Sequence, residues 1–262
     1  MEMLSGHRTS VRVVIAVLVT LLVESGSSYA QGVVLPMPQE DRQMITTKLG
    51  SNVVGQALPS AAIDDVSGYF PLEENAASYQ VTSGPNAGKS QKLGLAKVRR
   101  PNGAAAWRFQ FSPTLAGFIH QTQQGDLMIP AVGDMGEGVV VITTPANPFV
   151  MKGIKPGESR SYTQQVRVNA LDDPADQKYS GVLRGVYTYV GTYQVSVPAG
   201  TYKAVLLRVS CEGRVGPADT HDSAYYFFAP GKGVVAMINQ EDATAFWIIH
   251  IDTSSGKVLS SR

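Results

Sequence analysis

Cysteine, histidine and charge are all scarce in this sequence, and each scarcity excludes a class of protein. Cys211 is the only cysteine in 262 residues, so no disulfide can form within the chain. The four histidines are isolated, without the paired spacing of a zinc site. Lysine and arginine number 22 against 21 aspartate and glutamate, with no polybasic run to bind nucleic acid. We therefore expect no metal, no cofactor and no nucleic-acid partner.

The first thirty residues (1–30) have the features of a secretory signal peptide. Arg8 and Arg12 precede a short apolar run, VVIAVLVTLLV, and Ser28-Tyr29-Ala30 supplies small residues at the two positions that matter for cleavage. The run is shorter than the roughly twenty residues that span a bilayer. No cysteine follows it to carry a lipid anchor. We expect cleavage after Ala30, no transmembrane anchor afterwards, and a periplasmic or secreted location.

Residues 31–68 form an N-terminal segment whose pattern differs from the rest of the chain. Its stretch QEDRQMITTKL has an acidic start and apolar side chains at Met44, Ile45 and Leu49, which predicts one short helix that ends near Gly50. The residues that follow, 64–68, predict a turn into the main domain.

From residue 69 to residue 262, short alternating runs are separated by turn signals. The candidate strands are 78–82, 93–98, 106–111, 118–121, 127–129, 139–143, 160–168, 182–190, 193–197, 202–211, 224–228, 234–239 and 245–251. This spacing predicts an all-β fold with one short N-terminal helix. An antiparallel curved sheet, a half-barrel and a barrel-like sandwich all fit, because strand number alone leaves closure open. Similar proline turns before Tyr79 and Tyr162 also allow two related halves that join near 145–148.

Two glycine-rich stretches imitate nucleotide-binding loops. SGPNAGKS (83–90) has Ser83 where a phosphate-binding loop needs its first glycine, and no helical pattern follows it. GDMGEG (133–138) precedes a strand instead of joining a strand to a helix. Both stretches predict turns between strands.

Signals for catalysis are weak. The chain has no Gly-x-Ser-x-Gly elbow, and Ser223 is near His221 only in sequence. Cys211 stands in an alternating strand, which favours a small buried side chain over a nucleophile. We expect no enzymatic activity; a hydrolase in which His221 and its acidic neighbours meet in a cleft is an alternative.

Aromatic side chains are the remaining signal. Tyr187, Tyr189 and Tyr193 occupy odd positions of a predicted strand and should share one face, while Phe246 and Trp247 belong to a late strand. Such residues either pack in a core or form the wall of an apolar cavity inside a curved sheet. These five residues are our expected ligand-binding site.

Three short motifs stand at predicted turns and strand entries: YFPL (69–72), VPAGTY (197–202) and APGKGVV (229–235). Together they resemble a group of exported bacterial β-proteins of unknown function, over roughly residues 69–252. The glycine and tryptophan usual after the first motif are absent, and Phe227-Phe228 stands where Trp-Tyr is usual. The resemblance implies an antiparallel sheet, such as the half-barrel of periplasmic lipoprotein carriers, and brings no catalytic residue.

These features predict an exported, non-catalytic β-protein that binds an apolar envelope molecule, a lipid or a lipid-linked compound, in its sheet. A protein–protein interaction or structural module at the cell envelope is the alternative, in which case the partner is an envelope protein. An undetected hydrolase is the second alternative.

Overall fold

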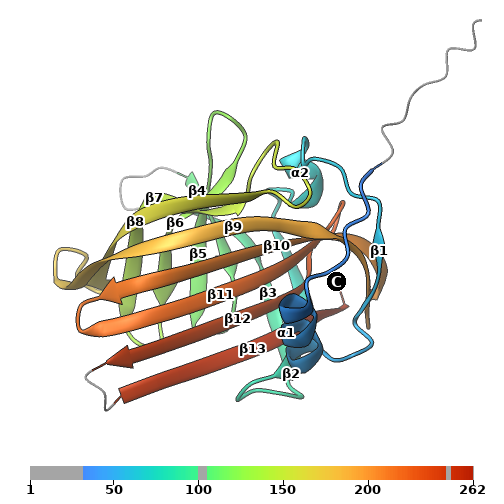
Figure 1. Ribbon diagram of the computed structural model, residues 1–262. Coiled ribbons are helices and arrows are strands. Elements are labelled where there is room, and N and C mark those ends of the chain that lie inside the picture. Colours follow the sequence, from blue (N-terminus) through green and yellow to red (C-terminus); the bar gives the residue numbers. More distant parts are fainter. Residues whose placement is uncertain (1–31, 100–104, 246–248, 262) are drawn as a thin grey trace, which may run out of the picture. The chain divides into compact units, whose positions relative to one another are not determined.

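Thirteen antiparallel strands form one continuous sheet in the computed structural model (Figure 1). The structure describes residues 32–99, 105–245 and 249–261, and of 241–245 and 249–253 it describes only the backbone. In chain order the elements are α1 (Gln39–Leu49), β1 (Val54–Leu58), α2 (Val66–Tyr69), β2 (Asn75–Ser83), β3 (Ser90–Arg99), β4 (Ala105–Gln110), β5 (Leu115–Gln121), β6 (Leu127–Asp134), β7 (Val139–Val150), β8 (Ser159–Ala170), β9 (Gln177–Val197), β10 (Gly200–Val215), β11 (Ala218–Ala229), β12 (Gly233–Ala245) and β13 (Ile249–Ser261). The predicted all-β antiparallel class is confirmed.

Pairing of β2 with β13, which are far apart in the sequence, closes the sheet into a barrel, and the long strand β9 has partners on both of its edges. One edge of β9 pairs with β10 from Gly181↔Val215 to Val197↔Gly200. Its other edge is shared, because β8 pairs with the first half and β1 pairs with the end. Strands β2 to β13 therefore form a closed ring, to which β1 adds a thirteenth strand. Among the forms that the sequence left open, the chain adopts the closed barrel.

The two ends of the barrel differ. Five turns of the described residues, 84–89, 111–114, 135–138, 171–176 and 216–217, lie at one end, which we call the turn end. At the opposite end, α2 and the β7–β8 loop bring apolar residues over the barrel, where Ile63 and Ile154 are fully buried and joined by a backbone hydrogen bond of 3.1 Å. We call this the plugged end.

Helix α1 lies on the outside of the barrel, next to β12, β13 and β2 (Figure 1). Its apolar Ile45 and Leu49 are buried, as is the carboxylate of Asp41. Thr82 donates a hydrogen bond of 2.6 Å to the carbonyl of Lys48, which fixes the end of the helix on β2. Gly256 of β13 lies beneath the same carbonyl, where a Cβ would come within 2.2 Å of the oxygen. The predicted helix is confirmed at both of its ends.

Some predicted strand boundaries were wrong. The runs 182–190 and 193–197 belong to one strand, because a bulge at Val190 lets β9 continue. The predicted strand 245–251 instead straddles the boundary between β12 and β13, which has no glycine or proline signal. Strand β1 and the one-turn helix α2 were not predicted. The expected join at 145–148 falls inside the continuous strand β7.

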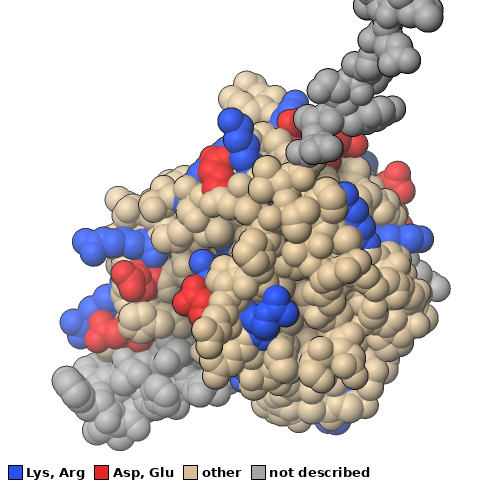
Figure 2. Space-filling model, turned by 45° about the vertical axis from the view of Figure 1, so that its right-hand side comes forward, with Lys and Arg blue, Asp and Glu red and all other residues tan. Residues whose placement is uncertain are grey.

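On the face drawn in Figure 2, lysine, arginine, aspartate and glutamate are scattered among uncharged residues. Neither helix of the described residues has the length or apolar character to cross a membrane.

Candidate functional site

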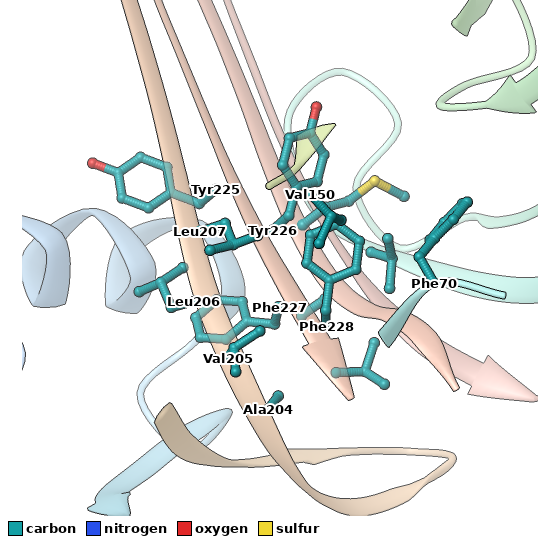
Figure 3. Close-up of a cluster of buried hydrophobic side chains, with 14 of the residues drawn as sticks. Phe70, Val150, Ala204, Val205, Leu206, Leu207, Tyr225, Tyr226, Phe227 and Phe228 are labelled. Atoms are coloured by element: carbon teal, nitrogen blue, oxygen red, sulfur yellow. The ribbon is translucent and has the colours of Figure 1, made fainter. Parts of the chain in front are cut away.

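The interior of the barrel is defined by alternation along its strands. On β10 and β11, the paired residues Val205 and Phe228 face inward, as do Leu207 and Tyr226. Their neighbours Leu206 and Tyr225 face outward, and Figure 3 shows them on the side of the helix while Tyr226 and Phe228 lie toward Phe70. The protein therefore has two apolar layers, one inside the barrel and one beneath α1.

Aromatic rings fill the plugged half of the barrel. Phe149 lies at the centre of this cluster, with edge-to-face contacts to Phe70, Tyr226 and Phe228 at centroid distances of 5.0, 5.4 and 5.2 Å. Phe111 joins it at 6.3 Å, also edge to face. Such contacts contribute about 0.5–1.5 kcal/mol each beyond area burial, so this half is a rigid core.

The half nearer the turn end contains a cavity of about 370 Å³, which we call the inner chamber. Its floor is the side of the aromatic cluster that faces the turn end, formed by Phe111, Phe149 and Tyr226. Its walls include Ile129, Val141 and Val209. This volume lies within the range of small-molecule sites, and a mostly apolar wall with a few polar groups is typical of them.

Polar atoms without partners face the inner chamber. Thr143 is only 7% exposed, and its hydroxyl has no hydrogen-bond partner among the described residues; the same holds for Oδ1 of Asn147. Both residues line the chamber. A buried polar atom without a partner costs free energy, so these atoms favour a bound molecule or ordered water in the chamber.

A second cavity of about 360 Å³, the lysine chamber, adjoins the first and shares Leu115, Asp134 and Asn239 with it. Lys257 of β13 lines it and is 3% exposed. The exposed turn residues Pro85 and Pro113 also line it, so the chamber reaches the surface at the turn end. Sequence reasoning missed Lys257, although this residue lies on the same face of a strand as Ser255 and Leu259.

The expected tyrosine site is not assembled as predicted. Tyr187 and Tyr189 face the barrel interior and are fully buried, but the bulge at Val190 reverses the alternation, so Tyr193 faces outward with its partner Ala204. The prediction that all three share one face was therefore wrong. Phe246 and Trp247 lie outside the described residues.

The three tyrosines are packed in the core, and none of them lines either chamber. The hydroxyl of Tyr193 has no hydrogen-bond partner among the described residues. The hydroxyl of Tyr187 donates a hydrogen bond of 3.2 Å to the carbonyl of Phe149, and the hydroxyl of Tyr189 lies 2.9 Å from the hydroxyl of Thr192. Burial raises the pKa of Tyr187 and Tyr189, and it raises the pKa of Tyr193 to about 12, with a smaller contribution from Asp41. Sequence alternation identified buried residues here, not the wall of a cavity.

His221 lies in an open groove of about 820 Å³, lined largely from the outer face of β8 to β12. Its Nδ1 is 3.9 Å from Oε2 of Glu212, and both side chains are about two-thirds exposed. Within the described residues His221 has no hydrogen bond to a serine, which a nucleophile–base pair requires. Cys211 borders the groove beside the hydroxyl of Tyr162 at 3.4 Å, and burial raises the pKa of its thiol, which disfavours the thiolate.

No protein-family model matches the chain, and no curated protein matches it. Three solved structures are similar to it at low identity. An exported protein with a YmcC-like fold from Bacteroides fragilis is 13% identical, with 74% of this chain and 97% of that chain covered and a TM-score of 0.38. The lipoprotein YmcC from Escherichia coli is 9% identical, with 71% and 86% covered and a TM-score of 0.36. A lipoprotein from Parabacteroides distasonis is 11% identical, with 76% and 99% covered and a TM-score of 0.30.

Proposed function

We propose that this protein is an exported, non-catalytic barrel protein that binds an apolar envelope molecule, a lipid or lipid-linked compound, in the inner chamber. The observation that carries the proposal is the division of the barrel interior. One half is a closely packed aromatic cluster, and the other half is a chamber of about 370 Å³ whose floor is that cluster. Export is supported by the charged start, apolar run and small residues of 1–30.

The chamber suits an apolar group with a few polar atoms. Phe111, Phe149 and Tyr226 offer rings, and Thr143 and Asn147 offer unpartnered oxygen atoms. Burial of apolar ligand surface contributes about 25 cal/mol per Å² before the costs of association, which is enough for a chain of several methylene groups to bind.

Two neighbouring residues of β7 provide a matched test. Val141 lines the chamber, whereas Val140 is absent from its wall and, by alternation, faces outward. Val141→Phe should fill part of the chamber and lower retention of the ligand about tenfold or more, whereas Val140→Phe should leave retention unchanged. Native mass spectrometry of the mature protein purified from periplasm, followed by solvent extraction, measures retention.

A discrete extra mass of lipid size that is lost in Val141→Phe and kept in Val140→Phe is the expected result. Thermal unfolding of both variants controls for misfolding. We call the proposed binding of an apolar envelope molecule the carrier function. It would be wrong if delipidated wild-type protein took up no lipid or apolar probe and its native mass were that of the bare chain.

The alternative, an interaction module at the envelope, is favoured by one observation. Met135, Leu171 and Tyr179 are 48%, 41% and 51% exposed, and all three belong to turns or strand ends at the turn end. Exposed apolar side chains near one another are typical of surfaces that meet a partner. Crosslinking in cells from a cysteine at Leu171 would recover a defined envelope protein under this alternative, and none under the carrier function alone.

A further inference from the structure

Lys257 is a buried cation that has no anionic partner among the side chains that the structure describes. Its side chain enters the barrel from β13 and is 3% exposed. The ammonium donates a short hydrogen bond to the carbonyl of Phe111, and no carboxylate of the described residues lies within 4.0 Å of it. Lysine is almost never fully buried unless it is paired. The burial of this charge therefore needs an explanation beyond packing.

The position of Lys257 is inside a chamber and not inside the packed core. It lines the lysine chamber together with the β2–β3 and β4–β5 turns, which include exposed residues. Two further polar atoms there, Oε1 of Gln91 and Oγ of Ser254, have no hydrogen-bond partner among the described residues. The side-chain amide of Gln91 and the hydroxyl of Ser254 can also donate, so the chamber offers donors beside the cation.

Asp134 is the other ionisable side chain among the described residues that line this chamber. Its Oδ1 accepts hydrogen bonds from the backbone amides of Gly136 at 2.8 Å and Glu137 at 3.2 Å. Its carboxylate is therefore engaged in the β6–β7 turn and forms no ion pair with Lys257. The ammonium has donor capacity left, since it can make three hydrogen bonds.

Desolvation lowers the pKa of Lys257 to about 8, from an ordinary value of 10.5. At neutral pH the group is still mostly protonated, at a cost in stability that a bound anion would offset. The lysine chamber shares Leu115, Asp134 and Asn239 with the inner chamber, so a single molecule can occupy both.

We propose that the ligand of this barrel is an amphipathic anion, whose carboxylate or phosphate head group binds Lys257 in the lysine chamber while its apolar chain lies in the inner chamber. This inference rests on the proposed function and gives it a ligand class. The head group accepts hydrogen bonds from the ammonium, and the chain lies on Phe111 and Tyr226. The ligand enters at the turn end, where the lysine chamber reaches the surface.

The test compares three probes of equal chain length on the delipidated mature protein: palmitate, hexadecyl phosphate and hexadecanol. Isothermal titration calorimetry at pH 7 should show an anionic probe binding roughly tenfold or more tightly than the alcohol, because a charge-assisted hydrogen bond replaces an unpaired charge. The tighter of the two anions identifies the head group. Lys257→Met should remove the preference for the anion, whereas Lys203→Met, at an exposed position on β10, should keep it.

The outcomes separate the two proposals. Equal binding of all three probes by the wild-type protein would overturn the anion preference and leave the carrier function standing. Binding of none of them would overturn both. An anion preference that survives Lys257→Met, or Lys257→Gln if the first variant does not fold, would assign the head group to another residue and overturn the role of Lys257. The wild-type comparison needs no variant, so misfolding of a variant leaves the test decisive.

Discussion

At the scale of single residues, a buried ion pair holds the N-terminal helix against the barrel. Asp41 of α1 is fully buried, and Nη1 of Arg208 on β10 lies 2.6 Å from its Oδ1. Arg208→Ala would leave a buried carboxylate without its cation, which should lower the free energy of unfolding by about 3 kcal/mol. Urea denaturation measures this loss. Arg214→Ala is the control, because that side chain is 68% exposed and 3.8 Å from Asp219, and should change stability by less than about 1 kcal/mol.

If Arg208→Ala and Arg214→Ala cost the same, the pair beneath α1 would not differ energetically from a surface pair. The double variant Arg208→Met/Asp41→Leu separates charge from packing. It should recover much of the stability lost in Arg208→Ala, because it removes the uncompensated charge along with its partner.

Lys257 should make stability rise with pH. Its folded-state pKa of about 8 is below the ordinary value of 10.5, so between these values the unfolded chain binds more protons than the folded protein. Titration of Lys257 alone should then increase the free energy of unfolding by roughly 2 kcal/mol between pH 7 and pH 9.5. The buried thiol of Cys211, whose pKa is raised from its ordinary value of 9.0, opposes this rise near the upper end of the interval, and buried tyrosines such as Tyr187 oppose it above about pH 10.

The rise is isolated by comparing wild-type protein with Lys257→Met in urea denaturation across pH 7 to 9.5. The variant should be the more stable one at pH 7, and the difference should shrink as pH rises. A constant difference would mean that Lys257 does not titrate in this interval.

At the scale of elements, β8 and β9 fit together through a glycine. Gly185 lies opposite Tyr162, and a Cβ at Gly185 would come within 2.2 Å of the tyrosine ring. Gly185→Ala should therefore displace the ring and lower the free energy of unfolding by about 1–3 kcal/mol. Combined with Tyr162→Ala, the glycine substitution should cost much less than it does alone, because the ring that it meets is gone. Thermal or urea unfolding of the single and double variants measures the coupling, and simple additivity would contradict the contact.

Local signals in the sequence predict some elements, whereas features that depend on distant parts of the chain are not predicted. Helix α1 was predictable because its start, apolar positions and terminal Gly50 are local signals. The face of Tyr193 was not, because a single extra residue at Val190 reverses the alternation, and the adjacent Gly191, which can mark either a bulge or a break, was interpreted as a break between two strands. Lys257 was overlooked for a similar reason: whether an alternating face of β13 is packed or lines a chamber depends on what lies across the barrel.

At the scale of the whole molecule, closure decides whether there is an inside at all. A half-barrel would leave the outer edges of β2 and β13, the first and last strands of the ring, unpaired, whereas the structure joins them from Gly256↔Ser83 to Ser261↔Ser78. Closure was not predictable from the number of strands, because it depends on this pairing between two strands that are far apart in the sequence. The extension of β9 beyond β8 has a separate consequence, since it lets β1 pair with the remainder of the same edge.

A disulfide across the closing pair tests this directly. Ser78 and Ser261 are paired neighbours on β2 and β13, and neither is buried. Cysteines at these two positions, in a Cys211→Ala background, should form a disulfide under mild oxidation, because directly opposed residues of an antiparallel pair have Cα atoms about 4.5–5.5 Å apart. Cysteines at Ser78 and Gln165, on strands that are not paired with each other, are the control and should stay reduced.

The crosslink is read as a loss of free thiol and a mass decrease of the intact protein. Failure of the first pair to oxidise while both thiols remain reactive would mean that β2 and β13 separate in solution, as in a half-barrel. The inner chamber would then be an open trough, and Val141→Phe would no longer be expected to exclude the ligand. A crosslinked protein that still takes up palmitate would show instead that the ligand enters through the turn end, past Pro85 and Pro113, without opening the β2–β13 seam.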